Sequence, residues 1–391
     1  MKDVAVVSYC RTGIAKAARG ALNQTHGIPL AAHVLTKAVE RAKIGGEEIE
    51  DVILGCGLPE GATGHNVARN AALAAFGIGV PGAVVNRYCG SGISAASDIA
   101  SRIATGEIAA GIAGGVESIS LVQFNLNFNG FFYEPLQQKM PAVWWTMNQT
   151  ADFVAQKYGF SREALDAYVV KSQARVAAAT AAGKYAEEIV PFGARMQVVD
   201  KATGEKKIQD VVLDRDEGPR PDTTAEGLAK LKPVYDGGTT TAGNASQLSD
   251  GAAAMVMMDA DLAAKRGLPI LGLFRGMQLG AVAPEEMSIA IAPAIRKLMK
   301  HHALAMQDVD LWELHEAYAV TTLYNQRELE TPWETTNVNG GAVALGHPYG
   351  MSGIRYVGST LMELARRGKK KAVVGVCTAG GMATAAYLER A

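Results

Sequence analysis

Apolar and polar residues alternate with two different periods along the first third of the chain. Short apolar or β-branched runs predict strands at residues 4–8, 49–54, 84–86 and 108–113. Apolar side chains three and four residues apart predict helices over 29–43 and 67–76. A further predicted helix begins near Ile93, whose face is continued by Ala96, Ala100 and Ile103. This alternation is typical of an α/β fold, in which helices cover both faces of a sheet.

The last third of the chain repeats this plan. Strands are predicted at 270–273, 337–339 and 372–377, and helices at 289–301 and around Ile354, Val357, Leu361 and Leu364. Residues 308–315 also align without a gap on residues 48–55. We interpret the first and last thirds of the chain as copies of one domain. The turn at Cys89 and the turn at His347 then occupy equivalent places.

The segment between the halves, from about residue 120 to 242, does not fit the pattern and is predicted to be an insertion. It contains a good helix over 164–182 and a charged stretch over 201–220. It is also rich in aromatic residues, namely Phe124, Phe128, Phe131, Phe132, Tyr133, Trp144 and Trp145. These rings either fill a small core of the insertion or shape a substrate pocket, because insertions beside active sites commonly select substrates.

Composition narrows the class of protein. With 391 residues, 48% hydrophobic and 20% charged, the chain is long enough for two or three globular units. A formal net charge of −1 gives no global field for nucleic acid or an anionic membrane. No apolar run is long enough for a membrane span, and the N-terminus is predicted to be a strand and not a targeting peptide. We therefore expect a cytoplasmic protein.

The four cysteines are Cys10, Cys56, Cys89 and Cys377, and none forms a CxxC pair. This spacing argues against a metal site and against a disulfide scaffold. Cys89 stands out because it lies between Gly90 and a preceding strand, at the start of a predicted helix. The positive end of a helix dipole favours a thiolate. A lone cysteine beside an apolar helix is, however, more often a buried small hydrophobe.

Two further residues lie on Gly-rich turns of the second half. His347 sits between Gly346 and Pro348, a poor place for core filler and a suitable one for a general base. Cys377 ends a predicted strand shortly before Gly380. Two cysteines and a histidine on matched turns indicate covalent thiol catalysis with a separate proton relay.

Several ordered motifs resemble those of the thiolase family, over nearly the whole chain. They are Asn86–Gly92, Gly114–Ser118, Thr241–Ser246 with Asp250–Ala253, Gly346–Pro348, and Cys377 with its glycines. The resemblance implies a duplicated five-layered α/β/α/β/α core with an inserted loop domain. The implied division is 1–119 with 243–269 for the N-terminal half, 120–242 for the loop domain that selects CoA and acyl group, and 270–391 for the C-terminal half.

The resemblance also implies a reaction, the reversible thiolytic cleavage of a 3-oxoacyl-CoA by coenzyme A. Cys89 would carry the acyl group, His347 would take its proton, and Cys377 would protonate the departing acetyl-CoA carbanion. One oxyanion hole would use the main-chain N–H groups of Cys89 and Gly380. The other would use His347 with a water held by an Asn-Glu-Ala-Phe motif, whose asparagine is replaced here by His315.

For the co-substrate CoA, the resemblance points to Arg220 at the nucleotide end and Ser246 at the pantetheine, with Met147, Ala317 and Tyr318 along the tunnel. A serine that some relatives have near the pantetheine is Gly227 here, and the residues before Met147 depart from common versions of the family. The aromatic residues in that stretch suggest an unusual acyl pocket. No permanently bound cofactor is implied.

The degradative reaction has rivals. An acetoacetyl-CoA-specific thiolase would condense two molecules of acetyl-CoA, and a ketosynthase of the same fold would usually need a second catalytic histidine and lack Cys377. A non-catalytic CoA-binding scaffold is the distant alternative. The pattern around 239–250 resembles the degradative branch, which favours a role in fatty-acid or related acyl degradation. Family members are usually homodimers or homotetramers.

Overall fold

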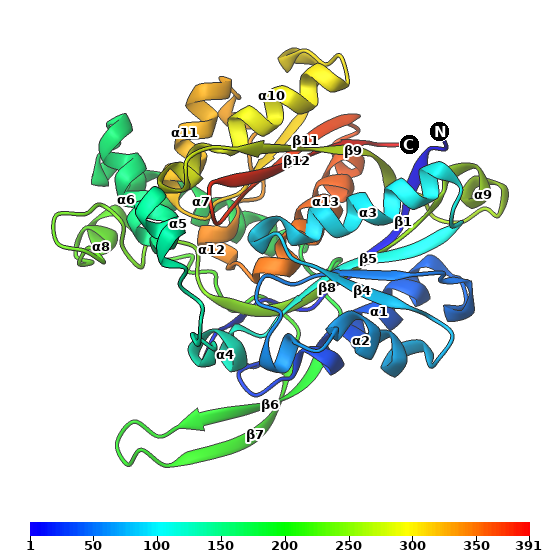
Figure 1. Ribbon diagram of the computed structural model, residues 1–391, viewed down its shortest axis with the longest axis horizontal. Helices are drawn as coiled ribbons and strands as arrows, with labels where there is room; N and C mark the ends of the chain where they lie inside the picture. The colour runs from blue at the N-terminus through cyan, green and yellow to red at the C-terminus, as the bar shows by residue number, and fades with distance from the viewer.

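The computed structural model describes residues 1–391 and has a mixed α/β architecture (Figure 1). Its strands are β1 (Val4–Arg11), β2 (Ala15–Lys16), β3 (Val52–Gly55), β4 (Gly82–Val85), β5 (Ala110–Glu117), β6 (Phe192–Val199), β7 (Lys206–Leu213), β8 (Ser249–Asp259), β9 (Gly272–Ala281), β10 (Leu311–Leu314), β11 (Lys371–Thr378) and β12 (Met382–Glu389). Its helices are α1 (Gly27–Ala42), α2 (Val67–Phe76), α3 (Ser91–Thr105), α4 (Ile119–Val122), α5 (Glu134–Lys139), α6 (Met147–Tyr158), α7 (Arg162–Ala181), α8 (Ala225–Ala229), α9 (Ala260–Lys265), α10 (Ile291–His301), α11 (Ala319–Leu329), α12 (Ala342–Leu345) and α13 (Tyr349–Arg366). None of these helices is both long enough and apolar enough to cross a membrane.

The sheet shows the expected duplication directly. From the centre outward, the N-terminal half has the order β1-β8-β5-β3-β4, and the C-terminal half has the order β9-β12-β11-β10. The outer pairs are parallel, namely β5–β3 and β3–β4 in the first half and β11–β10 in the second, and the inner pairs of both halves are antiparallel. The halves meet where β1 and β9 pair over Ala5–Leu273 and Val6–Gly272. Equal strand order and direction in the two halves are what a duplicated domain produces.

Helices and sheets form alternating layers (Figure 1). Helices α1 and α2 cover the outer face of the N-terminal half, and α10 covers that of the C-terminal half. Helices α3 and α13 fill the layer between, inside the core of 35 buried residues. They cross closely because a Cβ on Gly353 would lie 2.5 Å from the backbone nitrogen of Ile93. This central layer carries the Cys89 and His347 turns at its two helix N-termini.

One predicted strand, 337–339, is wrong. Only Thr336 forms a bridge, to Trp312, and Asn337 adopts a left-handed conformation with φ of 47°. Its side chain makes the bonds that a strand backbone would have made, since Oδ1 accepts from Leu314 N at 2.7 Å and Nδ2 donates to Leu314 O at 2.8 Å. The fifth strand of the second half is thus replaced by an asparagine side chain.

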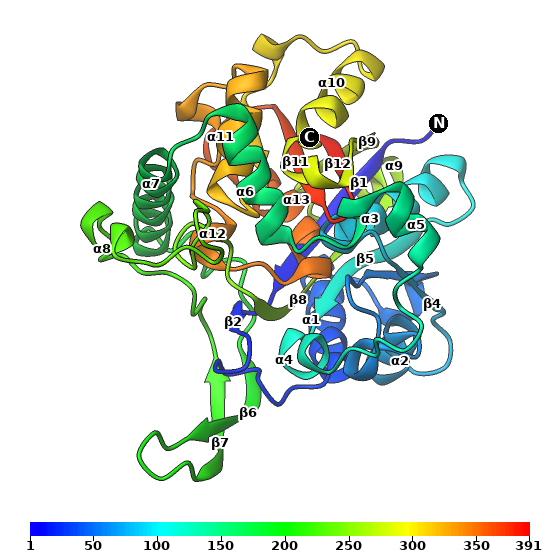
Figure 2. The same cartoon turned by 60° about the vertical axis from the view of Figure 1, so that its left-hand side comes forward.

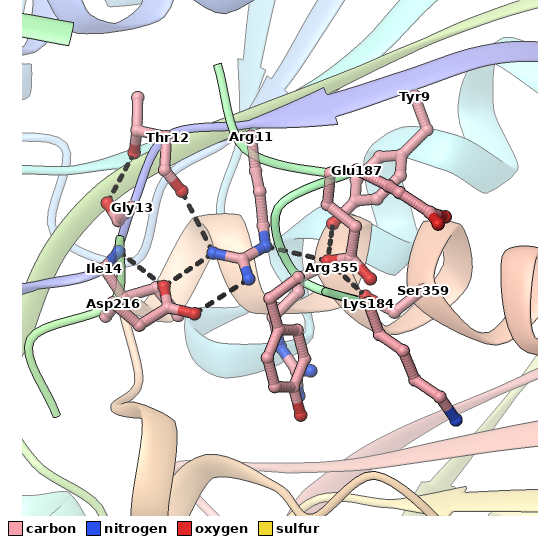
Figure 3. Close-up of polar contacts among 12 residues, drawn as sticks. Tyr9, Arg11, Thr12, Gly13, Ile14, Lys184, Glu187, Asp216, Arg355 and Ser359 are labelled. Atoms are coloured by element: carbon pink, nitrogen blue, oxygen red, sulfur yellow. Dashed lines mark hydrogen bonds and ion pairs between the residues drawn. The ribbon is translucent and has the colours of Figure 1, made fainter. Parts of the chain in front are cut away.

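The segment 120–242 leaves the sheet after β5 and returns to it at β8. It contains α4 to α8 and the hairpin β6–β7, which projects from the body (Figure 2). A buried ion-pair cluster anchors it, because Arg11 on β1 pairs with Glu188 at 2.8 Å and with Asp216 at 2.6 Å. Figure 3 shows the guanidinium of Arg11 turned toward Asp216, with Arg355 nearby. The two acidic partners flank the hairpin in sequence, so one arginine fixes both of its ends to the core.

Candidate active site

The turn that holds Cys89 is a tight elbow between β4 and α3. Tyr88 adopts φ of 44°, a left-handed conformation that costs energy for a tyrosine. The hydroxyl of Ser91 accepts from Arg87 N at 2.8 Å and donates to Tyr88 O at 2.6 Å, which ties the elbow to the first turn of α3. A Cβ on Gly90 would lie 2.7 Å from a methyl carbon of Thr378. Glycine at this position therefore lets the Cys89 elbow approach the end of β11.

The His347 turn fixes the orientation and the tautomer of the imidazole. Its backbone N–H donates to Gln247 O at 3.0 Å, and its Nδ1 lies 2.7 Å from the hydroxyl oxygen of Ser352. That hydroxyl donates its own proton to Pro348 O at 2.8 Å. The Ser352 oxygen must then accept, so Nδ1 carries the ring proton of the neutral imidazole. The lone pair is left on Nε2, which is buried and has no hydrogen-bond partner.

His315 and Cys377 come together at the ends of neighbouring strands. The backbone N–H of His315 donates to Gly375 O at 2.8 Å, which continues the parallel pairing of β10 and β11. The Sγ of Cys377 then lies 3.4 Å from Nδ1 of His315. The rings of His315 and His347 are 4.3 Å apart, centroid to centroid. Two imidazoles and a second thiol therefore form one contiguous cluster.

Burial keeps this cluster uncharged. It raises the pKa of the Cys89 thiol to about 12, with a further contribution from the carboxylate of Glu117, and these outweigh the backbone N–H groups of Cys89 and Ala379. It likewise raises the pKa of Cys377 and lowers that of His315 to about 3. Burial, followed by the neighbouring His315, lowers the pKa of His347 well below its usual range. Burial therefore opposes the helix dipole, which alone would favour the thiolate of Cys89.

Cys89, His347 and Cys377 open onto one cavity of about 370 Å³. Four of the residues expected to contact CoA line the same cavity, namely Met147, Ser246, Ala317 and Tyr318. No lysine, arginine, aspartate or glutamate lines it. The cavity therefore presents a few neutral reactive groups within a mostly apolar lining, which is typical of a small-molecule site.

The other two expected site residues lie beside or outside this cavity. Gly380 follows the lining residue Ala379 in the tight turn between β11 and β12, where its φ is 78°. Arg220 is exposed before α8, and only its backbone is held, through a 2.9 Å bond to Gln173 Oε1. The structure thus gathers the reactive residues and the four residues expected to contact pantetheine, and it leaves Arg220 on the surface.

Sequence reasoning missed several residues of the wall, including Leu58, Gln123, Met287 and Tyr349. Tyr349 had a signal, because it follows the His347–Pro348 turn directly. Its hydroxyl donates to Gln123 Oε1 at 2.7 Å and so ties the insertion to α13. The others come from loops whose positions depend on tertiary packing, and single-sequence patterns give no signal for them.

Two buried carboxylates hold the loops of the site in place. Glu117 accepts backbone N–H bonds from Gly57 at 2.9 Å and Gly350 at 2.8 Å. Glu316 accepts from Tyr168 Oη at 2.6 Å and Val343 N at 3.1 Å. Each carboxylate therefore links segments distant in sequence around the catalytic cluster. Sequence analysis placed both residues in motifs but assigned them no role.

Comparison with known proteins agrees with this architecture. Residues 4–261 match the family model "Thiolase, N-terminal domain", and residues 268–390 match "Thiolase, C-terminal domain". The chain is 42% identical to the 3-ketoacyl-CoA thiolase of Bacillus subtilis (strain 168), with 100% of both proteins covered. It is 41% identical to the peroxisomal 3-ketoacyl CoA thiolase 1 of Petunia hybrida, covering 99% of this chain and 84% of that protein.

A solved structure with the same fold is the crystal structure of the Bacillus anthracis acetyl-CoA acetyltransferase. It superposes with a TM-score of 0.87 at 34% sequence identity, covering 100% of this chain and 99% of that one. The two family models together extend over nearly the whole sequence and meet near the start of β9. This chain belongs to the thiolase family.

Proposed function

We propose that this protein is a 3-ketoacyl-CoA thiolase that cleaves a 3-oxoacyl-CoA with CoA to acetyl-CoA and a shortened acyl-CoA, as in fatty-acid β-oxidation. The observation that carries the proposal is the lining of one cavity by Cys89, His347 and Cys377, with the neutral imidazole of His315 packed against the last two. Thiolytic cleavage needs a nucleophile, a base and a separate acid, and this cluster supplies all three.

In the first half-reaction, Sγ of Cys89 attacks the 3-keto carbon and its proton passes to Nε2 of His347. The bond between C2 and C3 then breaks, and the electron pair left on C2 takes the proton of Cys377. The products are acetyl-CoA and an acyl group on Cys89. Because the pKa of Cys89 is raised and that of His347 is lowered, proton transfer is unfavourable in the empty site. The thiolate therefore forms only as sulfur bonds to the substrate.

In the second half-reaction, the thiol of CoA attacks the acyl group, loses its proton to the site and restores Cys89. One proton must also return from His347 to Cys377 in each turnover. His315 contacts both of these residues and can transmit it. When Cys377 donates to Nδ1 of His315, the Nε2 of His315 carries a proton that can be donated to the thioester oxygen. This direct donor would replace the water that an asparagine holds in relatives.

Coenzyme A is the co-substrate in this proposal. Its pantetheine arm would run past Met147, Ser246, Ala317 and Tyr318, which line the cavity. The exposed position of Arg220 suits the nucleotide end, which stays outside the cavity. The main-chain N–H groups of Cys89 and Gly380 would bind the oxyanion on the acyl carbon. We retain the division into 1–119 with 243–269, 120–242 and 270–391 as part of this proposal.

We also propose a reducing, cytoplasmic setting and a homodimer or homotetramer. Both reactive cysteines must remain thiols, and all four cysteines of the chain are free. The sheet ends at β4 with an unpaired edge, a feature that natural proteins usually cover. Light scattering during size-exclusion chromatography measures the oligomeric state, and a monomer at micromolar concentration contradicts this part of the proposal.

Intact-protein mass spectrometry with acyl-CoA tests the central claim. The wild type should gain the mass of the acyl group, and Cys89→Ala should gain none. Cys377→Ala should still be acylated by a preformed acyl-CoA, because that half-reaction breaks no carbon–carbon bond, yet it should lose thiolysis of a 3-oxoacyl-CoA. Cys10→Ala, at a buried cysteine outside the cavity, is the matched control. Turnover that persists in Cys89→Ala would indicate another mechanism, and a wild type that shows neither acylation nor turnover would leave only a CoA-binding scaffold.

A further inference from the structure

The aromatic residues of the insertion form a wall beside the reactive thiol. Phe131 lines the cavity that contains Cys89, and three other rings hold it in place. Their centroids lie 5.5 Å (Phe128), 5.1 Å (Phe132) and 5.2 Å (Trp144) from that of Phe131. Phe128 and Phe132 are more than half exposed, at 56% and 57%. The rings are therefore not the buried core of the insertion, and one of them faces the site.

The aromatic segment is attached to both halves of the core. Asn127 N donates to Glu60 Oε2 at 3.2 Å, and Gln123 accepts from Tyr349 Oη at 2.7 Å. Tyr349 directly follows the His347 turn, and its ring centroid lies 5.2 Å from that of His347. The aromatic segment thus has a defined position relative to Cys89 and His347.

The cavity has two sets of walls. Met147, Ser246, Ala317 and Tyr318 are the proposed pantetheine contacts, whereas the mechanism proposed above does not use a second set, Leu58, Tyr88, Leu126, Phe131, Trp145 and Tyr349. The second set is apolar or aromatic and contains no cation. Burial of each methylene against such a surface strengthens binding roughly fourfold, and the surface offers a carboxylate no cation to pair with.

We propose that this second wall selects bulky, uncharged acyl groups, best of all those that bear an aromatic ring, over the small acetoacetyl group and over dicarboxylic acyl groups. The inference rests on the thiolase function proposed above and names its substrate class. An aryl group bound to the 3-keto carbon would lie among Tyr88, Phe131 and Tyr349, where edge-to-face ring contacts add to the burial of apolar area. An acetoacetyl group leaves these rings without a partner.

The test compares kcat/KM for four substrates, acetoacetyl-CoA, 3-oxooctanoyl-CoA, 3-oxo-3-phenylpropanoyl-CoA and 3-oxoadipyl-CoA. In the wild type, the octanoyl and phenyl substrates should exceed the other two by about tenfold or more. Phe131→Ala should lower kcat/KM about tenfold more for the phenyl substrate than for acetoacetyl-CoA. Phe131→Leu keeps apolar volume without a ring, so its kcat/KM should fall less for the octanoyl substrate than for the phenyl substrate.

Phe124→Ala is the matched control, because Phe124 belongs to the same segment but is 58% exposed and does not line the cavity. This variant should change kcat/KM by no more than about twofold for any of the four substrates. The proposal is overturned if acetoacetyl-CoA or 3-oxoadipyl-CoA is the best substrate, or if Phe131→Ala lowers all four equally. In those cases Cys89 would still become acylated, so the thiolase function would stand. Absence of both acylation and turnover would instead contradict the function itself.

Discussion

The imidazole rings of His315 and His347 lie 4.3 Å apart, inclined at 55°, and the Nε2 of each ring is buried without a partner. Their other nitrogens have different partners, since Nδ1 of His347 lies against Ser352 and Nδ1 of His315 lies against Cys377. The hydroxyl of Ser352 accepts from Nδ1 of His347 and so leaves an acceptor on Nε2 of that ring, whereas the donor and acceptor roles of His315 Nδ1 and Cys377 Sγ depend on the tautomer of His315. In the proposed mechanism, His347 is the base, and the tautomer of His315 that accepts from Cys377 provides a donor to the oxyanion.

His315→Ala should lower kcat/KM by about 10²- to 10³-fold, because it removes a preorganised donor and the partner of Cys377. His315→Asn provides an amide donor in place of the imidazole, so its kcat/KM should fall only about tenfold. Steady-state thiolysis measures both variants, and hydrogen–deuterium exchange at the methyl group of acetyl-CoA isolates the step at Cys377. Equal activity in the wild type and in His315→Ala would contradict any part for His315 in the reaction.

Ser352→Ala should reduce kcat by about 10- to 100-fold with little change in KM, because Nδ1 of His347 loses the acceptor that fixes its tautomer. The overall fold should be unchanged, since the hydroxyl is small and its remaining bond is local. Ser352→Thr, which restores a hydroxyl, is the paired variant and should recover part of the rate. A loss of activity that tracks a loss of thermal stability would indicate a purely structural role.

The rate of Cys89 alkylation should rise about tenfold per pH unit from pH 6 to pH 9 without a plateau. Burial, aided by Glu117, raises the pKa of this thiol to about 12, so the thiolate fraction is still increasing at pH 9. An unperturbed thiol, with a pKa near about 8.5, would already be levelling off there. Iodoacetamide labelling followed by peptide mass spectrometry gives the rate at this residue. A plateau below pH 8 would show that the helix dipole prevails over desolvation.

Local pattern was sufficient to predict much of the fold. The apolar spacing over 67–76 predicts the helix that is found over Val67–Phe76, because Ala and Leu at that spacing satisfy both helix propensity and burial. The duplication was also predictable, since both copies retain strand and helix periods. Asn337 shows the limit, because a side chain that replaces backbone hydrogen bonds leaves no periodic signal.

Some features of the candidate site could likewise be predicted from the sequence, and others could not. Cys89 and His347 stand on Gly-rich turns, and Cys377 lies near the end of a strand that is followed by two glycines, features that can be recognised in the sequence. The contact between His315 and Cys377 joins residues that are 62 positions apart and depends on the register of β10 against β11. The environment of the Cys89 thiol is a second example. The helix dipole is local and visible in sequence, whereas the burial that raises the pKa of this thiol is produced by the complete fold.

Arg11→Ala should destabilise the protein by about 3–5 kcal/mol, because it leaves the buried carboxylates of Glu188 and Asp216 without their cation. The side chain of Arg11 is fully buried and joins β1 to both ends of the β6–β7 hairpin (Figure 3). Urea unfolding followed by tryptophan fluorescence measures the change. Arg296→Ala is the control, since its pair with Glu328 lies at the surface and should contribute far less. Limited proteolysis should also cleave the segment 190–215 faster in Arg11→Ala alone, because that variant frees the attachment of the segment to the core. An equal loss of stability in the two variants would contradict the view that the buried cluster anchors the insertion.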